Sequence, residues 1–340
     1  MLSARVVVSS IRRLSGVPIR QVKENKVDLL KANGVDVKRV WDEELLETFW
    51  DQRGRHCNDM KPSDIARWKS AYGDDFKAQA TFLKDTNELV ATVGAVGHYP
   101  ISPTGKPFVF MGLLWVKEEY RSSHMLAIQN VMVQENGEKF DVWSSSCLKS
   151  SINYWTSVSG SGRIDFNYFM SYYDFGDLKI PEDDYDDIVI RNAREVPDKD
   201  IIDYDRKVFN YERSNYILGQ LRDDYGRVAY NKSGEVVGFG AVSCYPSGEC
   251  CITPMYGENK MVARAIFKSI LEEMMPNKDK FWRLQVRSND RCKDSYEWIR
   301  PFVEPFIHRN HLATLMFTEA PEGIDTSRVF VNCHPILCPI

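Results

Sequence analysis

The sequence predicts an α+β protein with two mixed, largely antiparallel sheets flanked by helices, one after the other along the chain. Three strand-like runs precede a helix-like segment in residues 78–132, and the same order returns in residues 227–274. The residues themselves also repeat, because Lys84–Val90 aligns with Asn231–Val237 at an offset of 231 − 84 = 147 residues. A period this long predicts a duplicated domain and excludes a solenoid of short repeats.

The first copy begins with an alternating run at residues 35–40, followed by an amphipathic helix after Asp42 and a second helix after Pro62. Three strands and a further helix come next, and a fourth strand follows the Asn136-Gly137 turn. We interpret the dense aromatic run at residues 168–175 as a core strand and an inter-domain surface. The predicted ranges are strands at 78–83, 89–96, 108–116 and 140–143, with the helix from Tyr120 through Met132.

The second copy follows an acidic segment, residues 181–187, which has the composition of an exposed linker. One long helical stretch is expected at residues 201–221, between the first and second strands. The predicted strands are 187–190, 227–230, 236–242, 250–253, 281–286 and 312–317, with helices at 261–274 and 296–302. The division we expect is a separate segment at 1–25, domains at 30–178 and 188–340, and a linker at 179–187.

Composition excludes several classes of protein. The 340 residues are 43% apolar and 12% aromatic, as in a folded domain, and the net charge of −4 argues against a nucleic-acid or membrane-surface partner. The 8 cysteines include no C-x-x-C pair, which is typical of a reducing compartment. The spacings of His308 with His311 and of Cys333-His334 with Cys338 match no zinc pattern, so we expect no metal site.

The first twenty residues contain four arginines and four serines and no acidic residue. This is the composition of a mitochondrial transit peptide, and the alternative is an ordinary N-terminal segment. We expect a cytoplasmic or mitochondrial protein, with this choice open, and not a secreted one.

A three-stranded meander followed at once by a helix resembles the GNAT N-acetyltransferase superfamily, and the duplication resembles its tandem, YitH-type members. The resemblance covers most of residues 30–320. It implies that acetyl-CoA, or another acyl-CoA, pairs with the open edge of the strand Gly112–Val116, which includes Trp115 and Val116. It also implies that the pyrophosphate binds where the next helix begins, at Arg121, Ser122, Ser123, His124 and Met125.

The two copies depart from the family's phosphate-loop pattern to different extents. Arg121 matches the first position, but His124 and Leu126 stand where the family has small residues. The corresponding loop of the second copy, residues 257–261, lacks the basic first position and carries Glu258, which repels phosphate. We therefore expect the first copy to bind acyl-CoA and the second to be a degenerate domain that shapes the substrate site.

Direct acyl transfer to an amine needs a base for the attacking nitrogen and an acid for the leaving thiolate. By position in the resemblance, Tyr154 is the candidate acid, and His98, at the end of the third strand, is the candidate base. A structural tyrosine and a structural histidine are the alternative interpretations. The function expected is an acyl-CoA-dependent N-acyltransferase with a small-molecule or other amine-bearing acceptor. The alternative is a GNAT-fold binding protein that has lost CoA affinity.

Overall fold

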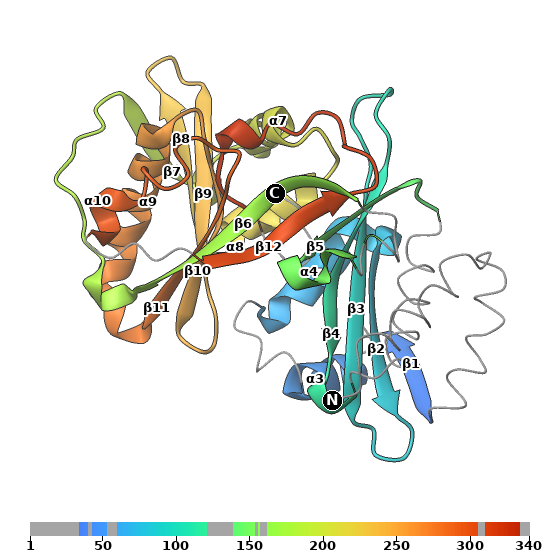
Figure 1. The fold of residues 1–340 in the computed structure, drawn as a ribbon. Helices are drawn as coiled ribbons and strands as arrows, with labels where there is room; N and C mark the ends of the chain where they lie inside the picture. The colour runs from blue at the N-terminus through green and yellow to red at the C-terminus, as the bar shows by residue number, and fades with distance from the viewer. Residues whose placement is uncertain are drawn as a thin grey trace.

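The computed structural model describes residues 34–39, 43–52, 60–120, 139–153, 156, 162–304 and 310–333. Within them, thirteen strands form one continuous sheet, mostly antiparallel, with helices packed against it (Figure 1). The α+β prediction is confirmed, but the two expected sheets are joined into one.

The first half of the chain runs from β1 to β6. Pro62 opens α4, where the missing proline N–H is not needed, and the Asp64 carboxylate accepts from the Lys61 backbone N–H at 2.8 Å. The elements are β1 (Val35–Arg39), α3 (Glu43–Gln52), α4 (Pro62–Tyr72), β2 (Phe76–Leu83), β3 (Leu89–His98), β4 (Phe108–Val116), β5 (Val142–Cys147) and β6 (Arg163–Asp174).

The second half repeats this order from β7 onward and adds a final short strand. The elements are β7 (Ile188–Asn192), α7 (Asp198–Val208), α8 (Ser214–Asp223), β8 (Tyr225–Asn231), β9 (Val236–Cys244), β10 (Glu249–Gly257), α9 (Lys260–Met274), β11 (Arg283–Asn289), α10 (Arg300–Val303), β12 (Asn310–Phe317) and β13 (Val329–Val331).

Two predicted helices differ from the structure. The single stretch expected at 201–221 is two helices, α7 and α8, because Phe209 and Tyr211 form isolated bridges to Ile324 and Pro100 between them. The helix expected at 296–302 is confined to Arg300–Val303, since Pro301 is tolerated only in the first turn of a helix.

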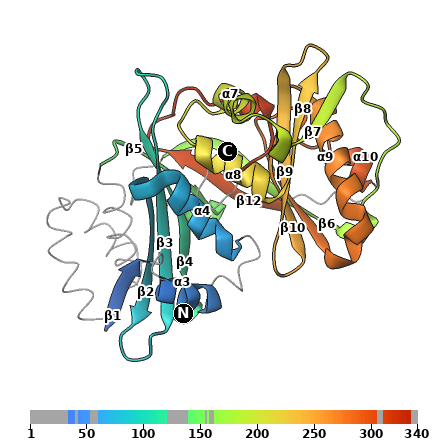
Figure 2. The same ribbon diagram turned by 180° about the vertical axis from the view of Figure 1, so that it is seen from behind.

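The halves exchange strands at the centre of the sheet. The order is β1-β2-β3-β4-β5-β12-β6-β11-β10-β9-β8-β7, so β12 from the second half lies beside β5, and β6 from the first half lies beside β11. Figures 1 and 2 show β6 and β12 running side by side from one half to the other. Each half therefore completes the other's sheet.

A shared hydrophobic core reinforces this exchange. Trp68 of α4 and Phe76 of β2 belong to the same buried cluster as Tyr216 of α8 and Phe239 of β9, all exposed by 2% or less. The helices α4 and α8 lie against each other between the halves (Figure 2). Burial of this much aromatic surface fixes the two halves relative to each other.

Candidate functional site

In the first half, β4 and β5 pair at one end and then diverge. The parallel pairing runs from Phe108 with Val142 to Met111 with Ser145. Beyond it, β5 continues beside β12. We call the gap between Gly112–Val116 of β4 and Ser146–Cys147 of β5 the first wedge. Among the described residues, no strand pairs with the edge of β4 that faces this wedge.

A β-bulge lies on β4 at the mouth of the first wedge. Its residue Leu113 has φ of 52°, a left-handed conformation that is unusual for a bulky side chain. The Thr92 hydroxyl donates to the Leu113 carbonyl oxygen at 2.6 Å. A Cβ on Gly94 would lie 2.7 Å from Leu113 Cδ1, so the glycine makes room for this side chain. The bulge therefore takes backbone groups of β4 out of the ladder.

The part of β5 that leads into the first wedge is polar. Ser144 and Ser145 are each 1% exposed, and their hydroxyls have no hydrogen-bond partner in the described part of the chain. Such groups are rare in folded proteins and are often satisfied by water or a ligand. Next to them, burial raises the pKa of Cys147 to about 11, so its thiol is protonated at neutral pH.

The second half contains the same divergence, but it is filled. The strands β10 and β11 pair in parallel from Glu249 with Arg283 to Cys251 with Gln285. We call the gap beyond, between Ile252–Gly257 and Val286–Asn289, the second wedge.

The strand β13 lies in the second wedge and pairs antiparallel with β10. The Asn332 backbone N–H donates to the Arg287 carbonyl at 3.1 Å, and the Asn289 side-chain amide donates to the Val329 carbonyl at 2.9 Å. The residues of β13 are exposed by 2% or less. The chain itself thus occupies the place that is open in the first half.

Two further features of the second half leave fewer backbone N–H groups free to bind a ligand there. The bulge of β10 contains Pro254, which has no N–H to donate, whereas Leu113 and Leu114 of β4 both have one. At the start of α9, the Asn259 side chain accepts from the backbone N–H groups of Met261 and Val262 at 2.9 and 3.2 Å. These N–H groups, which attract anions at a helix start, are already satisfied.

The structure describes three of the predicted site residues. Trp115 and Val116 are the last residues of β4, on the edge of the first wedge. His98 is fully buried beside Phe108, with ring centroids 4.8 Å apart, at the opposite end of β4 from the bulge. The others lie outside the described residues: Arg121, Ser122, Ser123, His124, Met125 and Tyr154.

Sequence reasoning missed several groups around the wedges. The run Ser144–Ser146 inside an apolar strand was a usable signal, because consecutive serines are unusual in a core. The sequence contains no signal for the left-handed conformation of Leu113. It also contains none for the pairing of β13 with β10. Leucine does not favour positive φ, and strand pairing between distant segments is not local.

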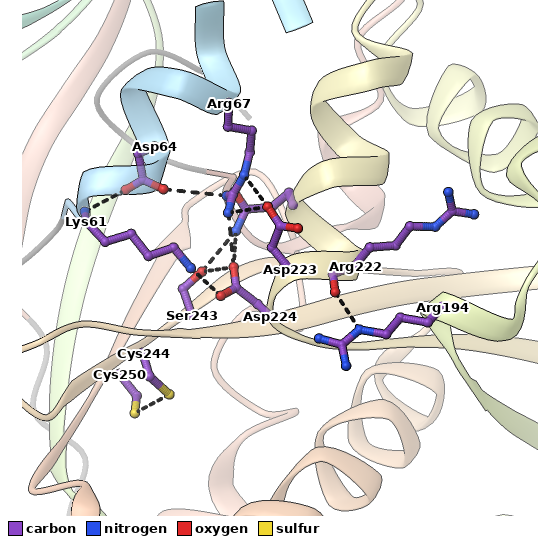
Figure 3. A network of polar contacts seen from close by, with 11 residues as sticks. Lys61, Asp64, Arg67, Arg194, Arg222, Asp223, Asp224, Ser243, Cys244 and Cys250 are labelled. Carbon is purple, nitrogen blue, oxygen red and sulfur yellow. Dashed lines mark hydrogen bonds and ion pairs between the residues drawn. The ribbon is translucent and has the colours of Figure 1, made fainter. Parts of the chain in front are cut away.

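Polar side chains join the halves where α4 meets α8 (Figure 3). Lys61 pairs with Asp224, and the Arg67 guanidinium donates to Asp223 at 3.1 Å and to the Gln220 side chain at 2.7 Å. Burial raises the pKa of Asp64, in the first turn of α4, to about 6. These contacts hold α4 against α8.

The profile of one sequence family matches residues 32–208, which is more than half of the chain. The chain belongs to this family, DUF1248, described as a protein of unknown function. A search of the curated proteins finds no match to this DUF1248 member.

Solved structures similar to this DUF1248 chain share its fold at low identity. A candidate acetyltransferase from Pyrococcus horikoshii is 15% identical over 89% of this chain and 96% of its own, with a TM-score of 0.61. A tandem GNAT protein from the clavulanic acid biosynthesis pathway is 10% identical over 86% of this chain and 99% of its own, with a TM-score of 0.58. The Saccharomyces cerevisiae N-myristoyltransferase with bound myristoyl-CoA is 9% identical over 88% of this chain and 85% of its own, with a TM-score of 0.53. The fold is therefore that of the GNAT acetyltransferases, in tandem.

The described residues contain neither a helix suited to cross a membrane nor a group of metal ligands. No described helix combines the length and the apolar character needed to cross a membrane. In the same residues, no group of three or more His, Cys, Asp or Glu side chains is arranged to hold a metal ion.

Proposed function

We propose that this protein is an acyl-CoA-dependent N-acyltransferase whose single acyl-CoA site is the first wedge. The observation that carries the proposal is the contrast between the wedges. Among the described residues, no strand pairs with β4 where it diverges from β5, whereas β13 pairs with the corresponding edge of β10. An extended chain that pairs with an open strand edge gains main-chain hydrogen bonds, and the amides of a pantetheine arm offer the same chemistry.

The residues of the first wedge support acyl transfer. Acyl-CoA supplies an activated acyl group as a thioester. Backbone N–H groups of the Leu113 bulge would donate to its carbonyl oxygen, where negative charge develops during attack by an amine. Ser145 is the last residue of β5 that pairs with β4 before the wedge, and its buried hydroxyl would gain a partner in the bound molecule. The neutral thiol of Cys147 is a poor nucleophile, which favours direct transfer over an acyl-cysteine route.

The remaining roles are carried over from the family resemblance. We assign the pyrophosphate to the segment Arg121–Met125, where the sequence predicts the start of a helix. We assign protonation of the leaving thiolate to Tyr154. His98 as the base needs a relay of intervening groups, because its ring lies at the far end of β4 from the bulge.

The domain division proposed is 30–178 and 188–340 with a linker at 179–187, as in YitH-type tandem proteins. Because β6 and β12 are exchanged, neither domain would complete its sheet alone. The second domain would line the acceptor site, and the acceptor would be a small molecule or peptide that carries an amine.

Isothermal titration calorimetry with acetyl-CoA tests the proposal. We expect one molecule bound per chain, followed by amine-dependent release of CoA thiol with a panel of small amines and peptide N-termini. The absence of binding would overturn the proposal and favour the alternative, a GNAT-fold protein that has lost CoA affinity. Two molecules bound per chain would contradict the single site.

A further inference from the structure

A pair of cysteines lies across the β9–β10 hairpin, away from the first wedge. Cys244 and Cys250 face each other directly in the antiparallel register, and their sulfur atoms are 3.0 Å apart (Figure 3). Both are free thiols.

The turn of the hairpin brings this pair together. The Tyr245 N–H donates to the Glu249 carbonyl at 2.8 Å, and the Gly248 N–H donates to the Tyr245 carbonyl at 2.9 Å. Gly248, with φ of 82°, provides the left-handed residue that such a turn requires. Cys244 and Cys250 are therefore the next pair along the ladder, a non-hydrogen-bonded pair. The Cα atoms of such pairs are about 4.5 Å apart, within the range of a disulfide.

The two thiols differ in accessibility. Cys244 is partly exposed, whereas Cys250 is fully buried. The hydrogen bond with Cys244, together with burial, raises the pKa of the Cys250 thiol. Cys244 is thus the thiol that meets a reagent from solvent, and Cys250 is held beside it in position to resolve the product.

We propose that Cys244 and Cys250 form a redox-active cross-strand dithiol that hydroperoxides convert to a disulfide. The Cys244 thiolate attacks the peroxide oxygen, the O–O bond breaks, and Cys244 becomes a sulfenic acid as hydroxide leaves and takes up the thiol proton as water. Cys250 then attacks the sulfenic sulfur, the S–S bond forms, and a second water leaves. Two thiols and hydrogen peroxide give one disulfide and two waters.

The reverse step needs only a thiol reductant, such as glutathione, by thiol–disulfide exchange. Disulfides in reducing compartments are usually transient and redox-sensing. Ser243, the neighbour of Cys244, donates to Asp224 at 2.5 Å in the network that joins the halves. The dithiol thus lies one residue from the contact between α4 and α8.

The test treats the full-length protein with hydrogen peroxide, alkylates free thiols and cleaves after glutamate. Cleavage after Glu249 separates the two cysteines, so a disulfide joins a peptide ending at Glu249 to one beginning at Cys250. We expect this linked pair, with a mass lower by two hydrogen atoms, and its loss after glutathione is added.

Three variants decide the assignment. Cys244→Ser and Cys250→Ser should each abolish the linked peptides. Cys251→Ser is the matched control, because its position lies in the same peptide but pairs with Ser243 and points to the other face of the sheet. That variant should keep the link. A thermal melt of each reduced variant confirms folding.

Oxidation that stops at sulfinic or sulfonic acid on Cys244, without linked peptides, would overturn the proposal. A link that survives in Cys250→Ser, or that is lost in Cys251→Ser with the fold intact, would also overturn it.

Discussion

The two halves of this protein repeat one fold but treat the same gap between parallel strands differently. In the first half, β4 and β5 diverge around a bulge at Leu113, and the described chain adds no strand there. In the second half, β13 pairs with β10 in the gap. Pro254 removes one N–H from the bulge of β10, and Asn259 caps the N-terminus of α9. The comparison teaches that two copies of one fold can diverge at the same gap, because the second copy fills with its own chain an edge that the described residues of the first copy leave unpaired.

The largest effect that the comparison predicts concerns β13. Phe330 is 2% exposed in the core of the second half, so Phe330→Ala should lower the unfolding free energy by about 3–5 kcal/mol. Chemical denaturation measures this loss. Val189→Ala, at a side chain 48% exposed, is the control and should stay within about 0.5 kcal/mol of wild type. The folded Phe330→Ala protein should bind acetyl-CoA with the affinity of the wild type. A weaker affinity for acetyl-CoA would indicate that the cofactor binds in the second half.

The contact between the halves contains Asp64, and its raised pKa predicts that the unfolding free energy depends on pH. Asp64 has a folded pKa of about 6 against 3.8 ordinarily. Below pH 3.8 it is protonated in both states, and as the pH rises to 6 the unfolded chain ionises first. Asp64 therefore lowers stability as the pH rises, by about 3 kcal/mol above pH 6.

The unfolding free energy of Asp64→Asn relative to wild type measures this effect. Between pH 4 and pH 6 the wild type should lose stability relative to Asp64→Asn, and above pH 6 the difference between their unfolding free energies should stay constant. A difference independent of pH would mean that Asp64 ionises in the folded protein as it does in the unfolded chain.

The loop Arg121–Met125, which we assign to the pyrophosphate, and the start of α9 provide a matched pair of charge reversals. Arg121→Glu should weaken acetyl-CoA binding by roughly 10- to 100-fold, about 1.4–2.8 kcal/mol, because it puts an anion beside the pyrophosphate. Lys260→Glu, at the start of α9, should change the affinity by less than about twofold. Calorimetry with acetyl-CoA on both variants measures the two affinities. An equal loss of affinity in both variants would contradict a single acyl-CoA site in the first half.

The smallest effect concerns the two bulges. Thr92→Val removes the hydroxyl that donates to the Leu113 carbonyl, and should lower stability by about 1 kcal/mol and slow acyl transfer. The matched control is Thr253→Val in the bulge of β10. Its buried hydroxyl has no hydrogen-bond partner in the described part of the chain, so its loss should be neutral or stabilising. Unfolding and steady-state kinetics of both variants decide the point.

Local patterns of the sequence predicted most of the elements. The strand Phe108–Val116 has the predicted ends, α9 begins one residue earlier than predicted, and the aromatic run at 168–175 lies largely in β6 at the centre of the sheet. These segments combine strong periodicity with clear turn residues such as Asn87 and Gly234, which adopt positive φ.

Features that depend on contacts between distant segments were not predictable. The exchange of β6 and β12 follows from pairing across more than a hundred residues. The aromatic run of β6 indicates a core strand, but it does not indicate which strands pair with it. β13 is only three residues long, too short for a periodic pattern. The place of Trp115 and Val116 at the end of β4 was predictable from the local strand pattern, whereas the contacts of Thr92 and Gly94 with Leu113 depend on the bulge and were not.

The central claim is that one wedge binds acyl-CoA and the other does not. Hydrogen exchange with and without acetyl-CoA, read by mass spectrometry over both wedges, tests it most directly. We predict slower exchange in residues 108–116 and 142–147 when acetyl-CoA is bound, and no change in residues 249–257 and 283–289. Protection confined to β10 and β11, or equal protection of both wedges, would contradict the account.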